Sequence, residues 1–141
     1  MRRVLWLPGI LLALLACAGE NALDSLALQE NRYSYSGYDS TGVKIVQGWI
    51  EFQTTDSSTV VGQWELSPVG NPQQIGPQTG SGELSGGQVD GRIYMDLNPT
   101  YRDNNVVLEA DYNREKLDGE WSYIGFPGVL NRGSFKAVRE R

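Results

Sequence analysis

The chain has 141 residues, which is enough for one domain, with 17 acidic residues, 12 basic residues and no histidine. The acidic excess argues against a nucleic acid partner and against electrostatic binding of anionic lipid by a cluster of basic residues. The missing histidine removes the usual general base near neutral pH and the commonest metal ligand. We therefore expect a non-enzymatic protein with no catalytic residues, no cofactor and no metal site.

The N-terminal stretch has the pattern of a targeting segment. Arg2 and Arg3 supply a positive start, and residues 4–16 form an apolar run interrupted by Pro8-Gly9. A helix of about 13 apolar residues is too short to span the hydrocarbon core of a bilayer without strain. The pattern predicts that residues 1–16 are a signal peptide.

This segment ends in Leu14-Leu15-Ala16-Cys17. The end resembles the lipobox of bacterial lipoprotein signal peptides, in which an aliphatic, a small-to-medium and a small residue precede a cysteine. The resemblance implies cleavage before Cys17, lipidation of Cys17 and attachment to a membrane through the lipid. The alternative is an ordinary secretory signal with an incidental cysteine, which is the chain's only one and has no partner for an intrachain disulfide.

The residue after the cysteine bears on the location. In two-membrane bacteria, an aspartate there is associated with retention in the inner membrane, whereas this chain has Ala18. The resemblance thus implies a cell-envelope protein, and an outer-membrane protein if its source has an outer membrane. Residues 17–31 are then a lipidated tether, with a short helix at residues 22–29 as an alternative to a loose linker.

From residue 32 onward, apolar and polar residues alternate, which is typical of strands with one buried and one solvated face. The alternation places a domain at residues 32–139 with strands at residues 32–38, 43–53, 58–66, 83–88, 91–97, 106–112, 117–123 and 133–138. Residues 83–97 fit either a hairpin, with turn signals at Gly86-Gly87 and Asp90-Gly91, or one long bulged strand. The loop at residues 67–82, rich in proline and glycine, is interpreted as mobile, with a functional lid as the alternative. Residues 125–131, with Pro127 and Gly128, are predicted to form another loop.

A glycine recurs inside the strands in an apolar-x-Gly-x-apolar pattern. Full copies contain Gly48, Gly62, Gly91 and Gly119, each on the apolar face, and partial copies contain Gly37, Gly86 and Gly133. A missing side chain on the inner face lets a sheet coil tightly and leaves room for a large neighbour. The competing interpretation is that glycine is simply common in this chain.

Short turns between consecutive strands predict an all-β fold, an antiparallel up-and-down meander of about eight strands forming a small barrel. The Gly-x-Trp pattern over about residues 33–138 resembles the small avidin-like and lipocalin-like barrels. The resemblance lies in pattern only and assigns no binding residue. The interior of an eight-stranded barrel is mostly filled by side chains, with space for one small ligand at most.

Inward-facing aromatic residues are the candidates for lining a cavity, with plain core packing as the alternative: Trp64, Tyr112, Trp121 and Tyr123. Trp49 is predicted to face outward, either as a partner contact or as ordinary surface. The carboxylates Glu109, Asp111, Asp118 and Glu120 alternate with apolar residues and are predicted to form a solvated face. The functional alternatives for these carboxylates are a catalytic pair like that of a glycosidase or a weak calcium-binding site.

The sequence leaves two main functional hypotheses. The first is a lipid-anchored, non-enzymatic envelope barrel that binds a small apolar molecule. The second is a structural or assembly accessory that binds an envelope protein through its outer face or through an open edge strand. An enzyme based on carboxylates is a distant third.

Overall fold

The computed structural model describes residues 31–55 and 58–141. The predicted signal peptide, the lipidation site Cys17 and the tether up to residue 30 lie outside the described residues. The described chain forms eight strands: β1 (Arg32–Tyr38), β2 (Lys44–Thr54), β3 (Thr59–Pro68), β4 (Gly80–Val89), β5 (Arg92–Asp96), β6 (Asn105–Tyr112), β7 (Lys116–Gly125) and β8 (Gly128–Arg139).

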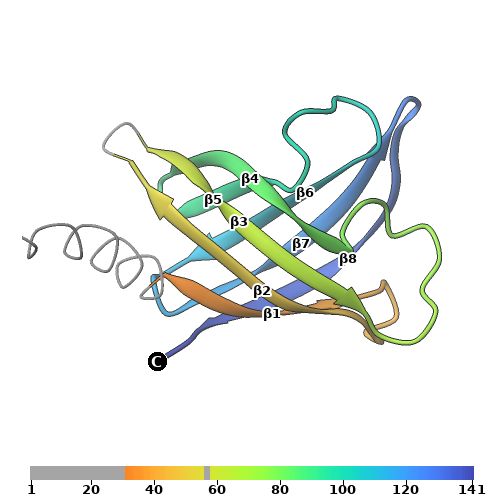
Figure 1. Ribbon diagram of the computed structural model, residues 1–141, viewed down its shortest axis with the longest axis horizontal. Helices are drawn as coiled ribbons and strands as arrows, with labels where there is room; N and C mark the ends of the chain where they lie inside the picture. The colour runs from red at the N-terminus through yellow and green to blue at the C-terminus, as the bar shows by residue number, and fades with distance from the viewer. Residues whose placement is uncertain (1–30, 56–57) are drawn as a thin grey trace, which may run out of the picture.

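Every strand pairs antiparallel with its neighbours in sequence, and β8 pairs back onto β1, so the sheet closes into a barrel (Figure 1). The predicted all-β meander is confirmed. Closure gives each strand two hydrogen-bonded neighbours and removes the free edges that would otherwise invite pairing with other chains.

The barrel interior is one continuous hydrophobic core. Apolar side chains alternate inward along each strand, as in β1, where Tyr33 and Tyr35 are each about 1% exposed. Aromatic rings stack within this core, Tyr33 on Phe52 and Tyr35 on Phe135, with centroid separations of 5.0 and 5.3 Å. Burial of such large rings is the main term that favours folding.

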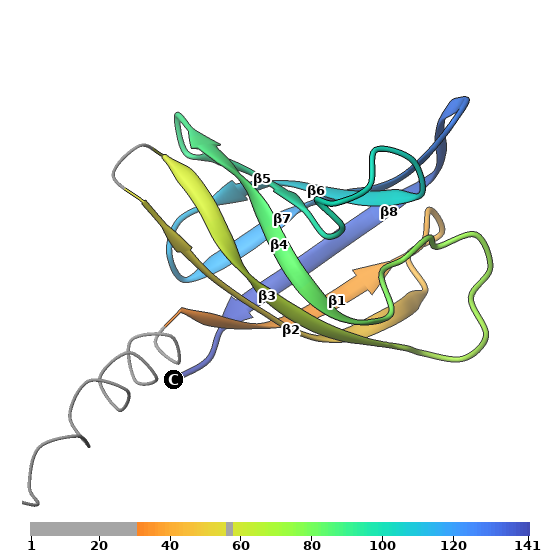
Figure 2. The ribbon, with the colours of Figure 1, turned by 45° about the horizontal axis from the view of Figure 1, so that its top comes forward.

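The two ends of the barrel differ. The start of β1 and the end of β8 lie at one end, which we call the terminal end (Figures 1 and 2). The loop at residues 69–79, which we call the lid loop, lies at the opposite end with the β1–β2, β5–β6 and β7–β8 connections. We call that end the mouth.

Three of the four predicted in-strand glycines lie where strands approach closely. A Cβ added to Gly48, Gly62 or Gly119 would lie about 2 Å from a carbonyl oxygen of the adjacent strand. The prediction for Gly91 is wrong, because this residue sits in the tight β4–β5 turn with a φ of 78° and no atom within 4 Å of its Cβ position. The close approach belongs to Gly86 instead.

Two connections between strands are also shorter than predicted. The expected loop at residues 125–131 is a tight hairpin, in which Gly125 pairs with Gly128 across Phe126-Pro127. The loop expected at residues 67–82 is shorter, since β3 runs to Pro68 and β4 starts at Gly80. Residues 83–97 form a hairpin that turns at Asp90-Gly91, and Gly86-Gly87 lies within β4.

Candidate functional site at the mouth of the barrel

The lid loop packs across the mouth onto strands from the far side of the sheet. The amide of Asn131 in β8 donates a hydrogen bond to the carbonyl of Gln74 at 3.1 Å. Gly76 lies so close to the ring of Tyr123 in β7 that a Cβ there would be 2.4 Å from a ring carbon. Ile75 and Tyr123 are partly buried against the core. The loop therefore covers one end of the barrel.

A hollow of about 540 Å³ lies between the lid loop and the β7–β8 hairpin. Its walls come from the apolar side chains of Ile75, Tyr123 and Leu130 and from Gly76 and Gln74, which add polar surface, and the hollow is open to solvent. The hydroxyl of Tyr123 donates to Asn104 Oδ1 at 2.9 Å, which fixes the ring at the wall. An apolar hollow with a few oriented polar groups is the usual form of a small-molecule site.

The candidate cavity residues from the sequence separate into two groups. Trp64 and Trp121 are buried in the core, and both indole N–H groups have backbone acceptors. Trp64 Nε1 donates to the carbonyl of Leu97 at 2.9 Å, and Trp121 Nε1 donates to the carbonyl of Tyr38 at 2.8 Å. Of the four candidates, Tyr123 lines the hollow at the mouth.

Tyr112 lies at the terminal end, away from the mouth. Its hydroxyl is 3.3 Å from the hydroxyl of Tyr33, which also donates to the carbonyl of Arg114 at 3.0 Å. Burial, followed by the hydrogen bond with Tyr112, raises the pKa of Tyr33 well above its ordinary value. The Tyr33 hydroxyl therefore stays protonated across the physiological pH range and acts as a neutral hydrogen-bonding group.

The four carboxylates lie on the outer face, as predicted. Glu109 is opposite Glu120 and Asp111 is opposite Asp118 across the β6–β7 pair. Arg92 forms an ion pair with Glu109, and Lys136 lies 4.0 Å from Asp118. In the part of the chain that the structure describes, no group of three or more acidic, histidine or cysteine side chains is placed to hold a metal ion.

Trp49 faces outward and is half-buried beneath another side chain of the same wall. The Arg32 guanidinium carbon lies 3.9 Å from the centroid of its ring, and Arg32 Nε donates to Glu51 Oε2 at 2.9 Å. The indole is thus covered by an intramolecular cation–π contact. This cluster ties the beginning of β1 to the middle of β2.

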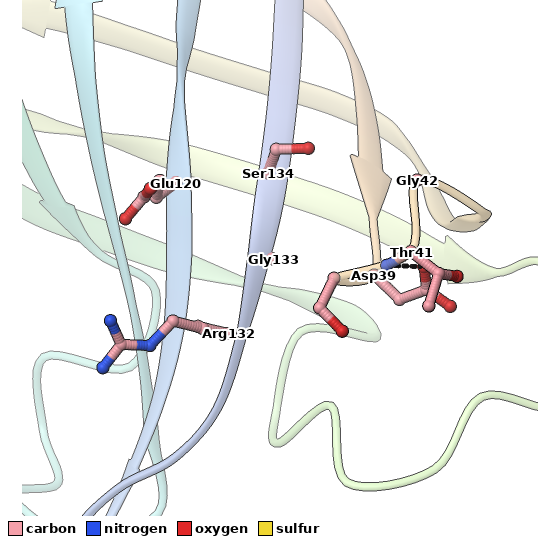
Figure 3. Close-up of a pocket in the computed structure, with 8 residues that line it drawn as sticks. Asp39, Thr41, Gly42, Glu120, Arg132, Gly133 and Ser134 are labelled. Carbon is pink, nitrogen blue, oxygen red and sulfur yellow. Dashed lines mark hydrogen bonds between the residues drawn. The ribbon is translucent and has the colours of Figure 1, made fainter.

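A second hollow, of about 460 Å³, lies on the outer wall (Figure 3). The turn at residues 39–42 forms one side, and Glu120 and Arg132 lie on the other. Asp39 is committed to the turn, because it accepts hydrogen bonds from the Thr41 hydroxyl at 2.7 Å and from the Val43 amide at 2.9 Å. These bonds lower the pKa of Asp39. The side chains that line this hollow are polar, whereas those at the mouth include Ile75, Tyr123 and Leu130, and both hollows are open to solvent.

The fold defines the class of protein: a closed, eight-stranded, antiparallel up-and-down barrel with a loop across one end. Comparison with known proteins found no matching family model, no matching curated protein and no matching solved structure. Across residues 31–55 and 58–141, no helix is long and apolar enough to span a bilayer. The functional argument therefore depends on the site itself.

Proposed function

We propose that this protein is a lipid-anchored, non-enzymatic envelope barrel that binds a small apolar molecule at its mouth. The observation that carries the proposal is the apolar hollow between the lid loop and the β7–β8 hairpin, lined by Ile75, Tyr123 and Leu130. Apolar side chains in a concave site favour an apolar ligand, and the lid loop supplies one wall of this site. The absence of histidine from the whole chain supports a binding role over acid–base chemistry.

The anchoring part of the proposal comes from the N-terminal sequence. Arg2, Arg3 and the apolar run that ends at Ala16-Cys17 support export, cleavage and lipidation of Cys17. Acyl chains on one residue hold a protein firmly, since each buried methylene contributes about 0.8 kcal/mol. Ala18 after the cysteine favours the outer membrane of a source that has one.

Replacing Cys17→Ser should abolish acylation, because the serine hydroxyl is not the thiol that receives the lipid. Incorporation of labelled palmitate measures this directly, and fractionation should show loss of membrane association. Ala18→Asp is the matched control: it should keep its acyl label and shift toward the inner membrane. A Cys17→Ser variant that is still labelled would refute the lipidation site.

A charge in the hollow should weaken ligand binding. In an unlipidated form covering residues 18–141, with folding checked by circular dichroism, Ile75→Asp should reduce the affinity for the neutral apolar fluorophore N-phenyl-1-naphthylamine at least about tenfold, since a carboxylate at an apolar contact costs several kcal/mol. Val89→Asp, at an exposed position in the β4–β5 hairpin at the terminal end, should bind as the parent does. Equal affinities in the two variants would place the ligand elsewhere.

A second candidate function is favoured by the tip of the β7–β8 hairpin, which projects beyond the barrel (Figure 2). Phe126 is 92% exposed, and Val129 and Leu130 beside it are 49% and 44% exposed. Exposed apolar clusters often mark protein contacts. We propose, as the alternative, that this tip inserts into an apolar pocket of an envelope protein.

A photo-crosslinking amino acid at position 126 tests this alternative in cells. We expect one adduct of discrete mass, which disappears when Val129 and Leu130 are both changed to serine. The same crosslinker at position 89 is the control, because Val89 is also exposed but lies in a hairpin at the terminal end. The same adducts from both positions, or none from position 126, would count against an assembly role.

A further inference from the structure

The exposed apolar side chains of the barrel gather at the mouth. Among residues 31–55 and 58–141, eight large apolar side chains are exposed, and five of them belong to connections at the mouth or to the strand end beside them. These five are Val43, Tyr101, Phe126, Val129 and Leu130. The other three belong to the β4–β5 hairpin and to β8 near the terminal end. Such a concentration of exposed apolar side chains marks a contact surface.

The tip of the β7–β8 hairpin is held in place outside the barrel (Figure 2). Gly125 pairs with Gly128, so the turn between them has two residues, and Phe126 in this turn is almost fully exposed. A Cβ on Gly125 would lie 2.6 Å from a methyl carbon of Leu130, so the Leu130 side chain packs along the hairpin. The hydrogen bond from β8 to the lid loop holds its base. A tip that is already ordered loses little conformational entropy when it enters a partner.

The mouth has no net charge, although the whole chain has a formal net charge of −5. The lid loop contains no charged residue, and residues 121–133 of the hairpin contain only Arg132. The β1–β2 and β5–β6 connections add Asp39, Arg102 and Asp103, so the charges of opposite sign cancel. The hairpin tip can therefore enter hydrocarbon without burying a charge, and the mouth is not repelled by anionic headgroups.

The chain before β1 is long enough to let the mouth reach the membrane that would hold a lipid on Cys17. β8 runs from the hairpin tip to the terminal end, and its 12 residues span about 40 Å. The Glu140 amide donates to the Arg32 carbonyl, so β1 begins where β8 ends. Residues 17–30 can span at most about 50 Å. A lipid on Cys17 and the hairpin tip can therefore enter the same bilayer.

We propose that the mouth docks on the bilayer that holds the lipid anchor, with Phe126 inserted among the acyl chains and Val129 beside it. This inference rests on the proposed function and adds the orientation of the barrel on its membrane. Leu130 both lines the hollow and is exposed beside the tip, so the hollow opens next to the bilayer surface. An apolar ligand then passes between the bilayer and the hollow without crossing bulk water.

A benzophenone amino acid at position 126 tests the docking in the full-length protein in its own membranes. This residue keeps an aromatic ring at the tip and reacts with acyl chains on illumination. We expect phospholipid adducts on the peptide that contains position 126, detected by mass spectrometry. The same amino acid at position 89 is the control and should form far fewer lipid adducts, because Val89 is exposed in a hairpin at the terminal end.

Two substitutions in β8 test the role of the tip. Val129→Asp places a carboxylate beside position 126 and should reduce the lipid adducts there at least about tenfold, since a charged side chain is costly in hydrocarbon. Val138→Asp, at an exposed position of the same strand near the terminal end, should leave these adducts unchanged. Circular dichroism checks that both variants fold. Equal losses in the two variants would overturn the insertion of the tip.

The remaining outcomes separate this inference from the proposed function. Lipid adducts at position 89 that equal or exceed those at position 126 would overturn the orientation. An adduct of protein mass at position 126, without phospholipid, would place the tip in a protein pocket instead. No lipid adduct in a chain that carries the acyl label and binds N-phenyl-1-naphthylamine would overturn the docking alone. Lipid adducts at position 126 in a chain that does not bind this fluorophore would support the docking and overturn the ligand site.

Discussion

Replacing Gly86→Ala should lower the free energy of unfolding by about 3 kcal/mol, at the upper end for overpacking a rigid site. A Cβ on Gly86 would lie 1.8 Å from the carbonyl oxygen of Tyr94 and 3.0 Å from the Cα of Met95. Both atoms belong to the backbone of β5, so no side-chain rotation relieves the contact. The β4–β5 pair must then separate at Gly86.

The neighbouring glycine is the matched control. A Cβ on Gly87 meets nothing closer than the carbonyl oxygen of Ser58 at 3.7 Å, which is ordinary contact. Gly87→Ala should leave stability unchanged or raise it by up to about 1 kcal/mol, since alanine restricts the unfolded chain. Urea denaturation followed by circular dichroism measures both variants. Equal stabilities would show that close strand approach at Gly86 does not shape the barrel.

Replacing Trp121→Ala should cost about 4–5 kcal/mol, the largest effect that we expect from a core side chain. The indole is fully buried, and its N–H donates to the carbonyl of Tyr38 at 2.8 Å. A Cβ on Gly133 would lie 2.7 Å from the indole nitrogen, so the ring fills the space that this glycine leaves. Truncation therefore opens a large cavity and removes the donor to a backbone carbonyl.

Two other variants divide this effect into its parts. Trp121→Phe keeps most of the apolar packing and loses the N–H donor, so it should cost about 1–2 kcal/mol. Trp49→Ala removes an outward indole that contacts Arg32, a cation–π interaction that contributes about 0.5–1 kcal/mol at an exposed site. If Trp121→Ala costs no more than Trp49→Ala, the core is not organised around Trp121.

The sequence was sufficient to predict the strand order, because period-two alternation and short turns are local features. The strands that they predict are the strands that pair in the barrel. The glycine pattern placed Gly91 on the inner face of a strand, whereas the turn signal at Asp90-Gly91 is the one that the structure follows. Because the chain reverses there, the spacing of Val89, Gly91 and Ile93 does not mark one face of one strand. Val89 is therefore outward and exposed. Pro127 and Gly128 were interpreted as a long loop, whereas a tight hairpin accommodates both.

The mouth could be predicted only in part. Tyr123 was identified because alternation points it inward near the end of β7. Ile75 and Gln78 carried no signal, since they lie in a loop whose position depends on contacts with β7 and β8. The burial of Gln78, with its Oε1 unpaired, is visible only in three dimensions, because any glutamine in a loop is expected to face solvent.

Mass spectrometry of the protein purified from its own membrane tests the central claim most directly, by comparing denatured and native masses. We expect the denatured mass to equal residues 17–141 plus the lipid on Cys17, and the native mass to exceed it by one small neutral molecule. An unmodified chain that starts at Met1, with identical native and denatured masses, would contradict both the anchor and the bound ligand.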